Sequence, residues 1–356
     1  MTVAGPLRSS EPDGPAPLLA PYTVADSDAA MLLERRSPQG SAFRLRFERP
    51  YFHRRAENFD CWQLVTARLN GELVGIGGGA LKPVTFEGRQ TTALYMFDVR
   101  VAPELRRRGV AQQLIAALRE WGAARAEFAY GLVAGDNEAV KRLTEDWFGA
   151  AASPACAFLV YPTYKASSTQ RNTRRDTPES VHAAFIASQG PFELYANPAA
   201  AFTSEGFIGS WVHANGGSRA GCSAWSNANI FSEVVERVPR PLAVIGAVLR
   251  TWPMSRLGGP PLPRPGERLR SWYIFDCYAT DAAAAAKLMS DVAAEAKAQG
   301  IDYCYVIHHP GAAWASALRR TFPTPLAPII PYSIVARQIS GVAVSVPSPY
   351  IDIRDV

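Results

Sequence analysis

The sequence has few of the features that mark secreted, metal-binding or membrane proteins. Its five cysteines are far apart and form no CxxC pair, which argues against both a disulfide scaffold and a zinc site. No apolar run approaches the roughly 20 residues that span a bilayer, and the first residues lack the cationic-then-apolar pattern of a signal peptide. We therefore expect a cytoplasmic protein without a metal and without membrane contact.

Charge is also sparse. Charged residues make up 19% of the chain, the net charge is only +5, and hydrophobic residues make up 48%. Positive charge is concentrated at Arg106–Arg108 and in "RNTRRD" (171–176), which is less than the basic face that nucleic-acid binding requires. With 356 residues, the chain is long enough for two globular domains.

The order of expected elements indicates an α/β fold built on a mixed (α+β) sheet. A helix follows the capping residues Asp26 and Asp28, and two strands within 61–84 meet at Asn70-Gly71, a strong hairpin signal. A third strand at 94–101 leads into a helix at 110–121, with Leu114, Ile115, Leu118 and Trp121 on one face. Strands at 127–134 and 155–164 flank a further helix that starts near residue 136.

The helix at 110–121 begins beside three arginines, although the positive end of its dipole should repel them. Free N–H groups of a first helical turn, Arg side chains and a glycine that allows close backbone approach together form a cradle for an anion such as a pyrophosphate. A solvated basic face is the competing interpretation. The position of the arginines and the spacing to Gly109 favour the cradle.

These residues resemble a known family. Arg106-Arg107-Arg108-Gly109-Val110-Ala111 matches the pyrophosphate loop of the GNAT superfamily of N-acetyltransferases. Val99-x-Val101-x-Pro103 upstream and Asn137-x-x-Val140-x-x-Leu143 downstream match its flanking segments.

The resemblance implies acetyl-CoA as co-substrate and direct transfer of an acetyl group to an amine. It implies cofactor contacts from Val99, Arg100, Val101, Arg106, Arg107, Arg108, Gly109, Val110, Ala111 and Asn137. Backbone N–H groups around Val99 to Val101 would polarise the thioester carbonyl.

The expected acid and base are Tyr164 and Asp98. Asp98 is the only carboxylate of its strand and precedes the Val99-x-Val101 pattern; a structural, hydrogen-bonded carboxylate is the equal alternative. Some relatives carry a base glutamate where this chain has Tyr95, and many carry a tyrosine where it has Thr144. Tyr164, like Tyr161, could instead serve packing, and a water-mediated route stays open.

A glycine run, Gly75-Ile76-Gly77-Gly78-Gly79-Ala80, superficially matches a dinucleotide fingerprint. The fingerprint requires a helix next, whereas "LKPVTFEG" favours a strand, so we reject that interpretation. The glycines serve either close backbone packing or an open substrate floor.

The second half repeats the first. Tyr273-Ile274-Phe275-Asp276 echoes Tyr95-Met96-Phe97-Asp98, and "IDYCYVI" (301–307) echoes "EFAYGLV" (127–133). The helix between them starts without arginine or glycine, so the second copy is predicted to be degenerate. The arrangement resembles the plant HOOKLESS-type tandem acetyltransferases. His308-His309 is interpreted as a polar loop, with a substrate contact as the alternative.

We thus predict a flexible tail at 1–20, a catalytic GNAT domain at 21–164, a linker at 165–181 and a degenerate GNAT-like domain at 182–356 that completes the acceptor cleft. The expected activity is N-acetylation of a primary amine on a small metabolite or a peptide, with no nucleic-acid partner. The alternative is a non-catalytic protein that binds acyl-CoA or has a regulatory role.

Overall fold

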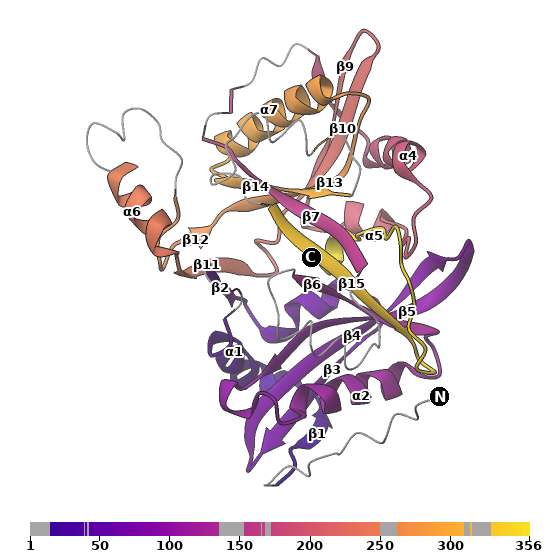
Figure 1. The fold of residues 1–356 in the computed structure, drawn as a ribbon, viewed down its shortest axis with the longest axis vertical. Coiled ribbons are helices and arrows are strands. Elements are labelled where there is room, and N and C mark those ends of the chain that lie inside the picture. The colour runs from indigo at the N-terminus through magenta and orange to yellow at the C-terminus, as the bar shows by residue number, and fades with distance from the viewer. Residues whose placement is uncertain are drawn as a thin grey trace, which may run out of the picture.

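The computed structural model describes a chain that divides into two similar halves joined by one continuous sheet (Figure 1). The described residues are 15–38, 40, 43–134, 153–164, 166–167, 172–249, 262–309, 314 and 329–356. Asn137, Val140, Leu143 and Thr144 of the sequence analysis lie outside these ranges. No helix in the described part of the chain is long and apolar enough to cross a membrane.

The first half is an antiparallel meander followed by a parallel crossover. Its elements are β1 (Leu18–Pro21), η1 (Val24–Asp26), α1 (Ser27–Arg35), β2 (Arg44–Glu48), η2 (Phe52–Asn58), β3 (Trp62–Leu69), β4 (Glu72–Phe86), β5 (Arg89–Val101), η3 (Pro103–Leu105), α2 (Val110–Gly122) and β6 (Phe128–Ala134). β6 runs parallel to β5. Asn70 and Gly71 both have positive φ, 52° and 85°, as a two-residue type I′ hairpin demands.

The glycine run of β4 brings α2 close to the sheet. A Cβ on Gly75 would lie 2.9 Å from Val110 and 3.1 Å from Leu114 of α2. A Cβ on Gly78, which faces the other side, would lie 2.7 Å from the Phe97 ring. The packing interpretation of these glycines is therefore right, and the apolar face predicted for α2 is confirmed, with Leu114 and Leu118 fully buried.

The second half repeats this order. Its elements are β8 (Thr173–Asp176), α4 (Pro178–Gln189), α5 (Ala199–Phe202), β9 (Phe207–Asn215), β10 (Ser218–Trp225), β11 (Ser232–Arg237), α6 (Arg240–Leu249), β12 (Arg268–Leu269), β13 (Ser271–Ala279), α7 (Ala282–Ala298) and β14 (Tyr303–His308). β13 and β14 are parallel around α7, as β5 and β6 are around α2. β8 and the start of α4 fall within the segment expected as a linker.

The two halves also share an irregularity. In β5 an extra residue disturbs the register with β4 between Ile76 and Gly78, and Asp98 has φ 51°. In β13 the register with β10 shifts between Gly221 and Ser223, and Asp276 also has φ 51°. The same bulge at the same place confirms the internal repeat that the two matching tetrapeptides indicate.

The two halves exchange their last strands: each of these strands pairs with a strand of the other half. β7 (Ser153–Pro162) pairs with β14, whereas β15 (Ile329–Gln338) pairs with β6 over Phe128–Ala134, and β7 and β15 pair with each other. The described strands thereby form a 12-stranded sheet in the order β1-β3-β4-β5-β6-β15-β7-β14-β13-β10-β9-β8. In Figure 1 the yellow β15 and the magenta β7 cross the centre of the molecule together.

A small second sheet joins the halves at one side. The segment β11–α6–β12 is inserted between the second-half strands that correspond to β4 and β5. β11 pairs with β12 and with β2 of the first half, so the insertion lies against the first half (Figure 1). The short 3-10 helix η5 (Ile353–Asp355) also packs against the core of the first half.

Candidate acyl-donor site

The parallel pair β5 and β6 opens at one end. The two strands pair only over Ala93–Tyr95 and Phe128–Tyr130, although β5 continues to Val101 and β6 to Ala134. Beyond this point no described strand pairs with the side of β5 that faces β6, while its other side remains paired with β4. Exposed strand-edge peptide groups can bond an extended ligand. Val99, Arg100 and Val101 lie on this open stretch.

The arginine loop follows directly. Arg107 and Gly109 have positive φ, 65° and 81°, and this backbone turn places Gly109 as the N-cap of α2 without a side-chain cap. Arg106, Arg107 and Arg108 are exposed, and none forms an ion pair with a described side chain. The first-turn N–H groups, starting with those of Val110 and Ala111, therefore share an exposed cationic position suited to a phosphate or pyrophosphate.

Arg100 differs from these three arginines. Its guanidinium is 11% exposed and its Nη2 lies 3.5 Å from Glu34 Oε1 and 4.0 Å from Asp98 Oδ1. The side chain thus turns toward α1, and only its backbone is placed on the open edge of β5. Val110 is buried under the loop as part of the core.

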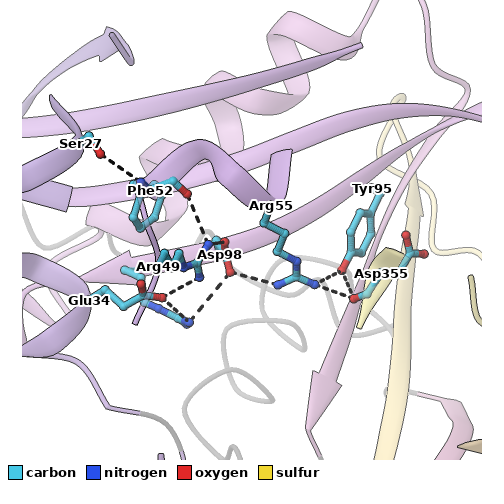
Figure 2. Close-up of polar contacts among 9 residues, drawn as sticks. Ser27, Glu34, Arg49, Phe52, Arg55, Tyr95, Asp98 and Asp355 are labelled. Atoms are coloured by element: carbon cyan, nitrogen blue, oxygen red, sulfur yellow. Dashed lines mark hydrogen bonds and ion pairs between the residues drawn. The ribbon is translucent and has the colours of Figure 1, made fainter. Parts of the chain in front are cut away.

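Asp98 lies in a closed ion-pair cluster (Figure 2). Its carboxylate accepts from Arg49 at 2.6 Å and from Arg55 at 3.1 Å, and Arg49 also bonds Glu34 at 2.7 Å. Burial acts to raise the pKa of Asp98, but the guanidiniums of Arg49 and Arg55 outweigh it and hold that pKa below its usual range. A carboxylate held as an anion by two cations is a poor proton acceptor.

The role of Asp98 as the base stays a prediction, and its surroundings favour the structural alternative. At the bulge the side chain of Asp98 points toward η2, where its carboxylate contacts the guanidinium of Arg55. The competing interpretation from the sequence, a hydrogen-bonded structural carboxylate, fits the geometry.

Tyr95 is tied to the segment that closes the chain. Its hydroxyl donates to the carbonyl of Asp355 at 2.6 Å, and Arg55 donates to the same carbonyl at 2.6 Å (Figure 2). Tyr130 on β6 donates to the Asp355 carboxylate at 2.8 Å. Burial raises the pKa of Tyr95, so the phenol stays neutral. These bonds anchor residues 352–355 beside the point where β5 and β6 separate.

Lys82 also holds residues 352–355 in place, and the sequence analysis did not identify it as a site residue. Its ammonium lies 2.8 Å from Asp352 and 2.5 Å from Asp355, and all three groups are buried. A pocket of about 110 Å³ adjoins it, lined from both halves by Phe59, Lys82, Asn197 and Arg354, among others. The only sequence signal for this cluster is the acidic residues of "SPYIDIRDV", whose partner in β4 cannot be identified from spacing.

Tyr164 lies elsewhere. It follows β7, which pairs with the second half, and it packs with the apolar cluster around α7. Lys297 of α7 donates to its backbone carbonyl at 2.6 Å. Tyr161 is buried in the same cluster. These contacts place Tyr164 with the second half, so they favour the packing alternative, and its role as the acid stays a prediction.

The second half has no equivalent cradle. Asp281 caps α7, and its carboxylate accepts from the N–H groups of Ala283 at 2.9 Å and Ala284 at 2.8 Å. A built-in anion therefore occupies the donors that an incoming phosphate would need. This confirms that the second copy is degenerate.

Neither histidines nor acidic residues form a metal centre in the described ranges, where no group of three or more potential ligands lies together. His309 packs its ring against Phe185 and Phe192, at centroid distances of 5.7 and 5.2 Å. Burial lowers its pKa to about 4, which keeps the ring neutral. This histidine thus serves an aromatic cluster.

Comparison with known proteins agrees with this geometry. Residues 29–150 match the model of the acetyltransferase (GNAT) family. No curated protein matches the chain. Among solved structures, N-myristoyltransferase of Saccharomyces cerevisiae with bound myristoyl-CoA is similar, with a TM-score of 0.55 and 13% identity, over 92% of this chain and 83% of that one.

A tandem GNAT protein from the clavulanic acid biosynthesis pathway has 11% identity and a TM-score of 0.49, over 91% of this chain and 98% of that one. At such identities the likeness concerns the fold alone. The family match covers α1 to α2 and the loop between β5 and α2, which are the elements that build the opening and the cradle. The likeness to the GNAT acetyltransferase family therefore spans residues 29–150, in a chain that repeats the same strand order a second time.

Proposed function

We propose that this protein is an acyl-CoA-dependent N-acyltransferase that uses acetyl-CoA and acylates a primary amine of a small metabolite or a peptide. The observation that carries the proposal is the joint placement of the uncapped α2 N-terminus, the arginines at 106–108 and the open edge of β5. One end of this surface suits a pyrophosphate and the other an extended amide-containing arm.

The reaction needs few protein groups. Acetyl-CoA supplies an activated thioester carbon; the amine nitrogen attacks it, the C–S bond breaks, and the thiolate leaves. N–H groups on the open edge near Val99 to Val101 are suited to bond the carbonyl oxygen as it gains charge. The amine must lose a proton on the way, and neither Asp98 nor Tyr95 is free to take it.

That last point favours a second candidate, a non-catalytic acyl-CoA-binding or regulatory protein. Both groups nearest to the positions of familiar catalytic residues are committed to internal bonds. Turnover separates the two candidates: thiol release with an amine panel supports the enzyme, and tight donor binding without release supports the regulator.

The first experiment is calorimetric titration of acetyl-CoA into the wild type and into the double variant Arg106→Ala/Arg108→Ala. A hydrogen bond to a charged group contributes about 1.5–3 kcal/mol, so the variant should bind at least tenfold more weakly. Arg174→Ala is the control, because Arg174 is an exposed arginine on β8, in the other half. Equal affinity of the double variant and the wild type for acetyl-CoA would disprove the proposed pyrophosphate site.

Two finer points remain proposals. All five cysteines are free thiols, which motivates a reducing compartment such as the cytoplasm. The resemblance to HOOKLESS-type tandem acetyltransferases rests on sequence motifs; acetylation of the same amine by both proteins would support it.

A further inference from the structure

The inserted segment carries a buried carboxyl group. Glu233 lies on β11 opposite Phe47 of β2, in the small sheet that joins the halves. Its Oε1 accepts a hydrogen bond from the Tyr273 hydroxyl at 3.3 Å. Its Oε2 is buried and has no hydrogen-bond partner. An unpartnered buried carboxylate oxygen costs free energy unless a ligand bonds it.

The groups around this carboxyl are aromatic. Tyr273 and Tyr305 stand side by side on β13 and β14, with ring centroids 5.2 Å apart, and the Tyr273 hydroxyl bonds Glu233. Phe158 of β7 contacts Tyr273 at 6.1 Å and Tyr332 of β15 at 4.6 Å. Burial raises the pKa of Glu233 to about 7, and the two tyrosine hydroxyls partly offset that rise.

The aromatic row Tyr305, Tyr273, Phe158 and Tyr332 ends at β15, the strand that pairs with β6. Tyr332 is paired with Ala134, the last residue of β6, on the far side of the opening from β5. Tyr130 of β6 and Tyr95 of β5 are register partners, and Tyr332 lies four residues from the partner of Tyr130, so all three side chains share a sheet face.

Contacts of the residues just before β11 reach the β5 bulge at Asp98. Phe231, two residues before Glu233, packs edge-on against Phe47 at 4.9 Å. The guanidinium of Arg49, which holds Asp98, lies 5.8 Å from the Phe231 ring. Glu233 therefore lies on a segment that only the second half supplies, two residues from Phe231, which packs beside the arginine that bonds Asp98 of β5.

We propose that Glu233, with the rings of Tyr273 and Tyr305, binds the ammonium group of the acceptor. A carboxylate oxygen accepts from an alkylammonium, and aromatic faces attract the same cation. This inference rests on the proposed function and names its substrate class: a primary alkylammonium, in preference to an alcohol. It also gives the inserted segment a task, to bring an acceptor-binding acid from the second half to the first.

The test compares n-butylammonium with n-butanol, which has the same chain and no charge. Saturation-transfer NMR at pH 8, where the carboxyl is ionised, measures the affinity of each probe for the full-length protein. The wild type should prefer n-butylammonium by at least tenfold. Glu233→Gln, which keeps shape and an oxygen acceptor for Tyr273, should lose this preference.

Two further variants serve as controls. Glu236→Gln removes an exposed carboxylate of the same strand and should leave the preference unchanged. Glu233→Asp keeps the charge and should keep a preference for the cation. The proposal is overturned if Glu233→Gln binds n-butylammonium like the wild type, or if the wild type does not discriminate between the probes.

Acetyl-CoA titration separates this proposal from the proposed function. Glu233→Gln should bind acetyl-CoA as the wild type does, because Glu233 is not part of the cradle. With any amine that is turned over, the same variant should raise KM for the amine by at least tenfold. Loss of donor binding in the wild type would refute the proposed function, whereas an intact donor affinity with an unchanged amine KM would refute only the role of Glu233.

Discussion

Asp98 and Asp276 show how partners change one residue type at the same backbone position. Both sit at a bulge with φ 51°, and both are buried. Asp98 faces arginines, which hold its pKa below the usual range despite burial. Asp276 accepts from His182 at 2.8 Å and Tyr350 at 3.3 Å, and burial raises its pKa. The same backbone position therefore carries two different electrostatic roles.

The first prediction concerns Asp98→Asn. Asparagine tolerates the positive φ, so the change removes charge and leaves Arg49 and Arg55 buried without this partner. The free energy of unfolding should fall by about 3–5 kcal/mol. Urea denaturation measures it, with Glu104→Gln, an exposed ion pair to Arg36, as a control that should change little. A small loss for Asp98→Asn would contradict the structural role.

The second prediction concerns pH and Glu233. Its folded pKa of about 7 lies above the ordinary value of 4.5, so protonation favours the folded state. This stabilisation is present below pH 4.5 and disappears as pH rises through 7. From pH 5 to pH 8, the free energy of unfolding should therefore fall by about 2 kcal/mol more in the wild type than in Glu233→Gln. Parallel pH curves for the two proteins would rule this out.

At the scale of elements, the proposed donor cradle depends on how closely α2 approaches β4. Small residues on β4 allow this approach, and Val110, the first residue of α2, touches Gly75 where the loop ends. The loop arginines have no described ion-pair partner to hold them. Their position is therefore set by the helix and by the turn at Gly109.

The third prediction follows from this packing. Gly75→Ala places a Cβ against Val110 and Leu114, displaces the start of α2 and should cost about 1–3 kcal/mol of stability. Acetyl-CoA affinity, measured by titration, should fall with it. Gly217→Ala is the matched control, because no atom lies within 4 Å of its added Cβ. A destabilised Gly75→Ala with normal donor affinity would show that the cradle does not depend on this contact.

At the scale of the whole molecule, the exchanged strands make each half depend on the other. β6 is covered by β15, and β14 by β7. The buried cluster of Lys82 with Asp352 and Asp355 links residues 273 positions apart. Without its partner, each half would expose a strand edge and an apolar surface.

The fourth prediction is that the halves do not fold separately. Residues 15–171 alone should lack the amide protection and cooperative melting of the full chain, because β6 loses β15 and β7 loses both β14 and β15. Adding residues 172–356 in trans should restore both, measured by hydrogen exchange and calorimetry. A stable, donor-binding 15–171 fragment would disprove the dependence.

The sequence alone determined those parts that local chemistry controls. The Asn70-Gly71 hairpin, the apolar face of α2 and the arginine loop follow from turn geometry, helical periodicity and the helix dipole, each within about a dozen residues. The internal repeat was visible because both copies kept a similar tetrapeptide at the bulge. The missing cradle in the second copy was equally local, since Asp281 caps the helix that would have held an anion.

Tertiary structure alone decided the rest. The pairing of β7 with β14 and of β15 with β6 depends on edges of distant strands, and it places Tyr164 against the α7 cluster. Asp98 became an ion-pair partner only because η2 brings Arg55 to it, and Glu233 lies beside Phe47 of the first half only because β11 pairs with β2. Such contacts join residues tens to hundreds of positions apart, and hydrophobic periodicity and spacing carry no information about which partners meet.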